Sequence, residues 1–360
     1  MNNRMKNIVV VALFMLLSVN LTMAQTRVEK KVATKASGYG VTYSLPKTVF
    51  VITVEVTKTT YKAGPYFRYA DIHLGIKDPI MEDMVNYEID KVSLTNKGVP
   101  DPDNTYVVEF KSGTVAPYVF LTNDGLLCSI NTEYIPVEPI TDNNSRLTEP
   151  EDINVTTVFT EEYLKAGTVA RQAEVAARQI YLLRERKLDI LTGDADNMPP
   201  DGESMRMIIK GLEDQEKMLA SLFAGSYTKE TLLHEITVVP QYEINDDVLF
   251  RFSKRQGLLD ADDLGGDPIY INLSITERAP ILSPKDEAKK EKSMKGVVYN
   301  LPGKSLVEIK DTQNTLFRGE MLVVQFGTKE SLVPVMFEDK KAPVKVTFYP
   351  EIGSIKQINQ

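Results

Sequence analysis

The feature of this sequence that most restricts its fold is a change of hydrophobic period near its middle. Between residues 160 and 224 apolar side chains recur every three or four residues, as at Val169, Ala173 and Ile180 and again at Ile208 and Leu212. This spacing places them on one face of each of two helices. The intervening segment 193–202 contains two glycines and two prolines and cannot continue a helix. The sequence therefore predicts an antiparallel helical hairpin.

The ends of the two predicted helices also carry local signals. Gly167 is unfavourable inside a helix, so the first regular helix is expected to begin only after it. Asp201 precedes the second apolar stripe and is the predicted N-cap of the second helix.

The regions on both sides of this hairpin read as β-structure. They contain runs of β-branched and aromatic residues separated by turn residues, which is typical of strands. The runs are 49–56, 106–110, 118–121, 233–239, 248–252, 269–275, 321–326 and 344–349. The predicted fold class is α+β and mainly β, with two strand-rich, sandwich-like modules at residues 26–150 and 226–356 separated by the hairpin at 160–224. This division suits a chain of 360 residues, which exceeds what one hydrophobic core usually holds.

Three shorter segments interrupt the strand pattern. Pro65 starts and Gly75 ends a predicted short aromatic helix, and Lys97-Gly98 and Pro100–Asn104 read as turns. The charged segment 283–295 has no apolar period and is predicted as an exposed loop. On the short helix, Tyr66, Phe67, Tyr69 and His73 form a possible recognition surface, because aromatic residues bury much area on binding. Packing in the interior is the alternative for each of them, and for His73 it is preferred to catalysis.

The first 24 residues have the three parts of a secretory signal peptide. Arg4 and Lys6 form a basic start, residues 8–19 are apolar but for one serine, and Thr22-Met23-Ala24 is a small-residue cleavage site. The apolar run is too short to serve as a permanent membrane span. We therefore expect cleavage near Ala24, no transmembrane segment afterwards, and a location in the periplasm or cell envelope.

Charge and cysteine content narrow the classes of function. Removing Arg4 and Lys6, with no acidic residue among the first 24, lowers the formal net charge from −8 to −10. Such an acidic chain is not expected to bind nucleic acid. Cys128 is the only cysteine, so no internal disulfide can form, and it is expected to be a half-buried strand thiol.

No catalytic, cofactor or metal motif is recognisable. The acidic loops at 194–203 and 260–267 lack the spacing of a helix–loop–helix calcium site, so solvated turn acids are preferred to metal ligands. His234-Glu235 is not followed by the second histidine of a zinc-protease helix, because residue 238 is valine. The sequence predicts no catalytic residue, no cofactor and no metal site.

A short internal similarity links the two strand-rich regions. Gly40-Val-Thr-Tyr-Ser-Leu-Pro46 matches Gly296-Val-Val-Tyr-Asn-Leu-Pro302 at five of seven positions, and each copy leads into a predicted strand. Either chance and similar strand-entry chemistry, or two related β-modules, explains the match. In the second case Tyr43 and Tyr299 are equivalent, with core packing preferred to an exposed contact role.

Seven short segments span nearly the whole chain after the predicted signal peptide: 40–47, 63–70, 74–75, 98–103, 191–196, 200–204 and 249–253. Together they resemble an uncharacterised family of exported Bacteroidota proteins, described as domain of unknown function 4831. The resemblance implies export into a Gram-negative envelope. It supplies no activity and no catalytic residue.

The sequence thus favours a non-enzymatic envelope protein that binds or scaffolds another envelope protein or a cell-surface glycan. The alternative is a hydrolase acting on an envelope or dietary polysaccharide, which requires a cleft with converging carboxylates. A carrier of a small ligand in a cavity between the β-layers is a third possibility.

Overall fold

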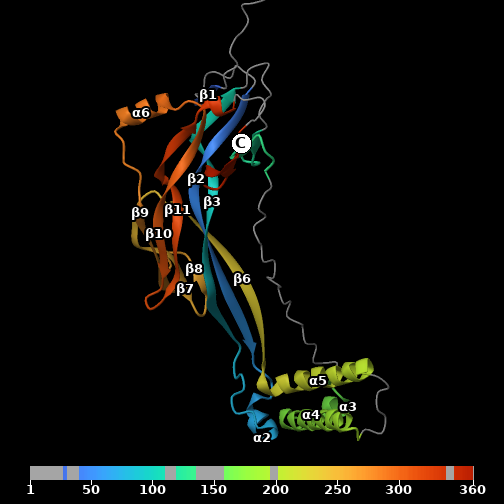
Figure 1. The fold of residues 1–360 in the computed structure, drawn as a ribbon. Coiled ribbons are helices and arrows are strands. Elements are labelled where there is room, and N and C mark those ends of the chain that lie inside the picture. Colours follow the sequence, from blue (N-terminus) through green and yellow to red (C-terminus); the bar gives the residue numbers. More distant parts are fainter. Residues whose placement is uncertain are drawn as a thin grey trace, which may run out of the picture.

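The computed structural model describes residues 27–30, 40–109, 119–134, 158–194, 202–337 and 344–359. Within these ranges the chain forms three antiparallel sheets and a group of helices at one end of the molecule (Figure 1). The predicted signal peptide lies outside the described residues. The predicted fold class is confirmed.

The longest strands form the first sheet. β2 (Gly40–Lys62) and β3 (Met84–Glu109) pair along almost their full length, and β6 (Ser226–Val238) pairs with the second half of β2. The short β1 (Arg27–Lys30) completes the order β1-β3-β2-β6. β6 follows the helical hairpin in sequence but joins a sheet begun before it. These strands run from the upper β-structure down to the helices (Figure 1).

The second sheet comes from the C-terminal part of the chain. It has the order β11-β10-β9-β7-β8, and its strands are β7 (Ile244–Ser253), β8 (Gly257–Leu259), β9 (Asp267–Glu277), β10 (Val297–Lys310) and β11 (Thr315–Leu332).

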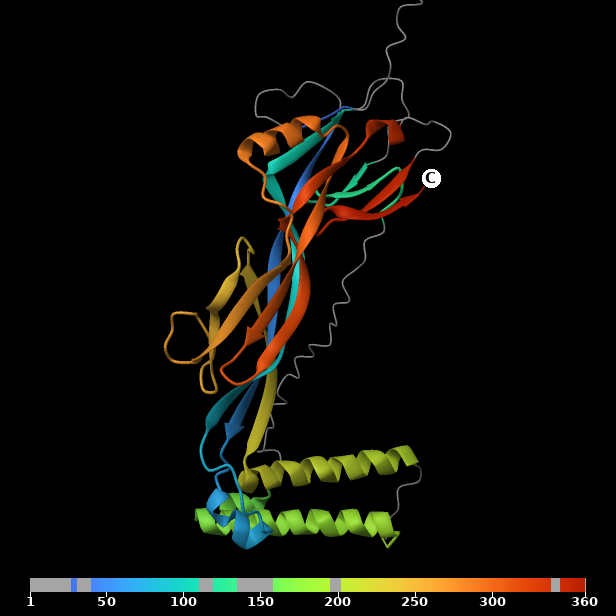
Figure 2. The same ribbon diagram turned by 60° about the vertical axis from the view of Figure 1, so that its left-hand side comes forward.

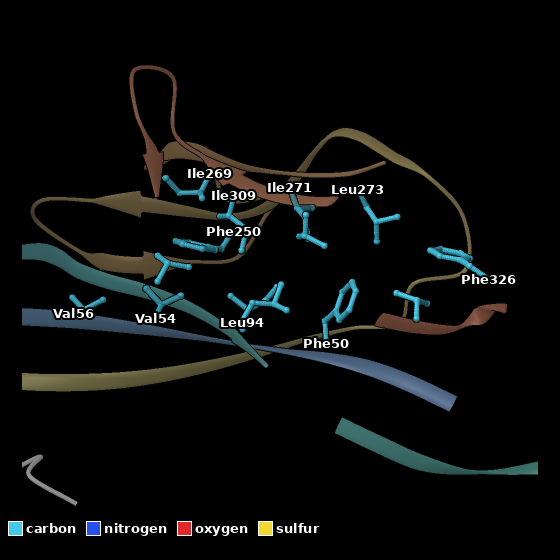
Figure 3. Close-up of a cluster of buried hydrophobic side chains, with 14 residues drawn as sticks. Phe50, Val54, Val56, Leu94, Phe250, Ile269, Ile271, Leu273, Ile309 and Phe326 are labelled. Atoms are coloured by element: carbon cyan, nitrogen blue, oxygen red, sulfur yellow. The ribbon is translucent and has the colours of Figure 1, made fainter. Parts of the chain in front are cut away.

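The first and second sheets face each other across one hydrophobic core. Phe50, Ile52 and Val54 project from β2, where alternate residues point to the same face. Phe250 and Leu273 of the second sheet meet them, and all five side chains are at most 1% exposed (Figure 3). The sandwich is therefore built from both strand-rich regions.

The third sheet also mixes the two regions. β4 (Val119–Leu121) and β5 (Leu127–Ile130) pair with β12 (Lys345–Tyr349) and β13 (Ser354–Asn359) in the order β13-β12-β5-β4. A second core beside this sheet contains Tyr43 and Tyr106, whose stacked rings have centroids 5.7 Å apart. The division at 26–150, 160–224 and 226–356 stays a prediction as a statement about domains, but strands from both outer regions share sheets and cores.

The helices formed by residues 67–74 and 161–224 gather at the far end of the long strands. α4 (Val169–Thr192) and α5 (Gly202–Ala224) run antiparallel and project sideways as an arm (Figure 2). The short helices η1 (Phe67–Tyr69), α2 (Ala70–Leu74) and α3 (Glu161–Lys165) pack at its base. The predicted hairpin is confirmed. Thr168 caps α4, so the helix begins just after Gly167 as expected, while the predicted cap Asp201 lies outside the described residues.

Two local predictions are wrong. The segment 97–104 does not end a strand, because β3 continues through it. Pro46 lies opposite Pro100, and Asp101–Asn104 form a bulge that faces Leu45. A bulge tolerates proline because its residues leave the hydrogen-bond ladder. Glycine is required at position 98 because a Cβ there would lie 2.8 Å from the Glu351 backbone.

The charged segment is a helix rather than a loop. α6 (Pro284–Ser293) is capped by Ser283, whose Oγ accepts a hydrogen bond from the Asp286 amide, and Pro284 occupies the first turn. Acidic residues in its first turn and lysines in its last complement the helix dipole. Lys290 anchors it to β11 through Thr328 and Glu330.

Candidate functional site

The arm is fixed to the body by the short aromatic helix. Gly75 ends α2 with a φ of 68°, a conformation that favours glycine. The Tyr66 amide donates to the Leu222 carbonyl of α5 at 2.8 Å, and the Tyr66 ring lies 5.4 Å from that of Phe223. The hydroxyls of Tyr66 and Tyr163 are hydrogen bonded to each other. Burial, and then this bond, raises the pKa of Tyr66.

These contacts change the interpretation of the predicted recognition surface. Tyr66 is 3% exposed and belongs to the interior. Phe67, Tyr69 and His73 are half-buried. The His73 ring contacts Tyr69 and Phe223, and its carbonyl accepts a hydrogen bond from Tyr181 of α4. The expected packing role of His73 is therefore met, and recognition by the three half-buried residues stays a prediction.

Small residues bring the helices of the arm together. Ala173, Ala176 and Ala177 are at most 4% exposed, and they pack in one cluster with Leu219 and Phe223 of α5. Alanine at these positions allows the two helices to approach closely. This core occupies the first half of α4 and the second half of α5, which is the half of the arm next to the body.

Ion pairs continue the contact between the helices beyond this core. Arg184 Nε lies 2.7 Å and Lys187 Nζ 3.2 Å from the Glu216 carboxylate. Burial opposes ionisation of this carboxyl, but hydrogen bonds from Arg184 and Lys187 outweigh it and lower the pKa of Glu216. The arm is thus held along its middle by charged groups.

The outer end of the arm carries large apolar side chains that remain open to solvent. Leu188 and Leu191 near the end of α4 are 59% and 61% exposed, and Met207 and Ile208 near the start of α5 are 70% and 45% exposed. We call these four residues the tip patch. Large apolar side chains exposed at the same end of two neighbouring helices indicate a contact surface. Sequence periodicity could not reveal the tip patch, because the spacing of apolar residues is the same whether or not a neighbouring helix covers them.

A cleft lies at the opposite end of the sandwich, under α6. Its volume is about 360 Å³. Of its carboxylates, Asp101 accepts hydrogen bonds from the Asp103 amide and the Asn104 side chain, and Glu291 pairs with Lys329. These two carboxylates therefore stabilise the cleft walls. The residues that line the cleft are Leu45–Lys47, Asp101, Asn104, Arg278–Leu282, Glu287, Lys290, Glu291, Met294, Asn300 and Val324–Lys329.

The acidic loops and the cysteine that were considered as sites from the sequence have structural roles or are buried. Asp263 in the 260–267 loop accepts the Gly265 amide at 2.8 Å, while residues 195–201 of the other acidic loop lie outside the described part of the chain. Within the described residues no group of three or more histidine, cysteine, aspartate or glutamate side chains is placed to hold a metal ion. Cys128 is 1% exposed, more deeply buried than expected, and burial raises the pKa of its thiol to about 11.

Fold and surfaces together define a mainly-β protein with a projecting helical arm, an exposed apolar tip patch and a cleft under α6. No helix among the described residues is long and apolar enough to cross a membrane. The family described as "Domain of unknown function (DUF4831)" matches residues 39–356, so the chain belongs to this family. No curated protein and no solved structure matches the chain.

Proposed function

We propose that this protein is an exported, non-enzymatic component of the cell envelope that uses its helical arm to bind another envelope protein. The observation that carries the proposal is the tip patch, whose four side chains are 45% to 70% exposed. Burying them against a partner releases water from apolar surface, which favours association.

The shape of the arm supports the same function. The arm projects from the long strands so that its outer end stands clear of the sheets (Figure 2). The contacts of Tyr66 and His73 with α4 and α5 fix its direction, and the Arg184–Glu216 and Lys187–Glu216 ion pairs hold its two helices together. A positioned binding surface loses less conformational freedom on association than a flexible one.

Export is supported by the order of basic start, apolar run and small-residue site in residues 4–24. The resemblance to exported Bacteroidota proteins agrees with this location, and we place the mature protein in the periplasm. Fractionation of native cells with mass spectrometry of the protein's N-terminus tests it. A mature N-terminus near Gln25 is expected in the envelope fraction, and recovery of an intact Met1 form from the cytosol would refute export.

The cleft favours binding over polysaccharide hydrolysis. A glycosidase requires two carboxyl groups directed at the bond that is cleaved. Of the three carboxylates in the lining, Asp101 is held within its own bulge and Glu291 is paired with Lys329, which leaves Glu287 without a second available carboxylate beside it in the lining. The arrangement therefore supports a binding protein better than the hydrolase.

Site-specific photocrosslinking in native envelopes tests the arm. A photoreactive residue at Met207 is expected to give one defined crosslinked protein, which is lost when Leu188, Leu191 and Ile208 are replaced by serine. The matched control places the photoreactive residue at Leu264, which is 83% exposed on the β-body. An identical product from Leu264, or a Met207 product that survives the triple substitution, would contradict the role of the tip patch.

A further inference from the structure

The two copies of the repeated sequence motif build the same local structure. In the first, Leu45 of β2 faces four residues of β3, 101–104, between the pairs Ser44–Thr105 and Pro46–Pro100. In the second, Pro302 of β10 faces four residues of β11, 324–327, between the pairs Leu301–Thr328 and Gly303–Val323. Each Leu-Pro step thus contains the residue that faces a four-residue bulge, although this residue is the leucine in the first copy and the proline, one motif position later, in the second. This shared irregularity supports two related β-hairpins over a chance sequence match.

The two motifs also bond to each other. The Tyr43 hydroxyl accepts a hydrogen bond from the Val298 amide at 2.9 Å and donates to the Val298 carbonyl at 3.2 Å. The Asn300 side chain donates to the Pro46 carbonyl at 3.2 Å. Tyr43 is 1% and Asn300 2% exposed, so these bonds are in the interior. They hold the two bulged hairpins in a fixed relation.

Both bulges line the cleft. Asp101 and Asn104 come from the first bulge, and Val324–Gly327 from the second. Thr48 and Gln325 join the two walls through the bonds Thr48 N to Gln325 Oε1, at 3.1 Å, and Gln325 Nε2 to Thr48 O, at 2.7 Å. Bulges that free backbone groups from a ladder are over-represented beside functional sites. The cleft is therefore preformed, and its volume is within the range of small-ligand sites.

The lining places four basic side chains, Lys47, Arg278, Lys290 and Lys329, and three acidic ones, Asp101, Glu287 and Glu291, beside apolar surface. Lys290 and Lys329 are paired with Glu330 and Glu291. Lys47 and Arg278 form no ion pair within the described residues, and the Arg278 guanidinium lies 5.8 Å from the centre of the Phe326 ring. The apolar part of the lining includes Met294, Phe326, Ile281 and Leu282, and the last two are 79% and 42% exposed.

Tyr106, which is not a lining residue, carries a buried hydroxyl two positions after Asn104 of the first bulge. Tyr106 is 4% exposed, and its hydroxyl has no hydrogen-bond partner among the described residues. Burial, and then the charges of the cleft residues Glu291 and Asp101, raises its pKa, so the group stays protonated and able to donate. A buried polar group without a partner is uncommon in folded proteins.

We propose that the cleft between the two bulged hairpins binds a small amphiphilic anion, a carboxylate attached to an apolar body. The carboxylate lies at Lys47 and Arg278, and the apolar body lies against Met294, Phe326 and the 279–282 segment. A free fatty acid and the C-terminus of an apolar peptide share this chemistry. The site is separate from the tip patch and does not depend on the arm.

Displacement of the fluorescent anion anilinonaphthalene sulfonate tests the cleft in the full-length mature protein. Octanoate, or the peptide acetyl-leucyl-leucine, is expected to displace the dye, whereas uncharged octanamide is not. Displacement by octanoate alone identifies the fatty acid as the source, and displacement by the peptide alone identifies a peptide C-terminus. Equal displacement by octanoate and octanamide would overturn the proposal, because no anion would then be recognised.

Substitutions locate the binding. Arg278→Ala and Lys47→Ala are each expected to weaken octanoate binding about tenfold, the effect of losing one charge-assisted hydrogen bond. Arg278→Lys is expected to retain most of it. The matched control is Arg186→Ala, another exposed arginine, located on α4, which leaves binding unchanged. Two results would refute the cleft as the site. The first is unaltered octanoate binding in both cleft variants with unchanged melting temperatures. The second is dye binding that is abolished only by serine at Leu191 and Ile208.

Discussion

The β-body and the helical arm are stabilised in different ways. In the body, hairpins such as β2–β3 are joined to distant parts of the chain, since β5 pairs with β12 and Phe50 of β2 shares a core with Phe326 of β11. In the arm, nearly all contacts are made within residues 158–224 and the short segment 66–76. The body can therefore fold only when segments distant in sequence pair. The helices of the arm are specified by local sequence, and contacts with the body fix only the direction in which the arm projects. We expect the two regions to respond separately to substitution.

The largest effect is expected from the core between the two facing sheets. Phe50→Ala removes a fully buried ring and should lower the free energy of unfolding by about 3–5 kcal/mol. Chemical denaturation followed by tyrosine fluorescence measures it. Leu264→Ala, at an 83% exposed position, is the control and should change stability by less than about 0.5 kcal/mol. Equal effects at both positions would show that this core does not hold the sheets together.

A smaller and more local effect is expected in the arm. Phe223→Ala removes a fully buried ring that contacts Tyr66 and His73, at a cost of about 3 kcal/mol. Hydrogen exchange should speed up in α4 and α5 while β9 and β10 keep their protection. Equal loss of protection in β9 would show that arm and body unfold as one unit.

The bond between the two repeated motifs gives the next effect. Tyr43→Phe removes the hydroxyl that bonds the Val298 amide and carbonyl, leaving buried backbone groups unpaired at a cost of about 1–3 kcal/mol. Tyr299→Phe is the matched control, since the Tyr299 hydroxyl makes no hydrogen bond within the described residues and the loss should be near zero. Thermal unfolding measures both. Equal losses of stability in the two variants would show that the Tyr43 hydroxyl does not link the two motifs.

The smallest effect at neutral pH concerns Cys128. Burial raises its thiol pKa to about 11, so native protein at pH 8 should react with a thiol reagent at least about a hundredfold more slowly than unfolded protein. Because the folded pKa exceeds the unfolded one, this thiol's contribution to stability is complete below about pH 8.5 and is lost as pH rises towards 11. Cys128→Ala should flatten that alkaline decline. Rapid labelling of native Cys128 would contradict the burial.

Local sequence patterns were sufficient to predict the two long helices, but they did not predict where strand β3 continues or that residues 284–293 form a helix. The three- and four-residue spacing around Ala173 and Leu219 predicted both long helices, because helical period depends on neighbouring residues. The same reasoning misread Pro100–Asn104 as a turn and residues 284–293 as a loop. Strand β3 continues past the prolines because β2 supplies a matching register, and α6 is fixed in place by Lys290 reaching β11. The continuity of β3 and the placement of α6 depend on partners that are distant in sequence, whereas the signals that make residues 284–293 a helix, the Ser283 cap and Pro284, are local.

The features of the candidate sites also divide into those set by local sequence and those set by tertiary packing. The sequence alone determined the helical hairpin, the alternation that makes β2 a core strand, and the similarity between residues 40–46 and 296–302, since all three are properties of neighbouring residues. Only the tertiary structure decided that Tyr66 is buried while Leu191 and Met207 are exposed, and that the two similar segments meet beside one cleft. Exposure and cleft formation are set by which distant surfaces pack together, and periodicity along the chain carries no information about that choice.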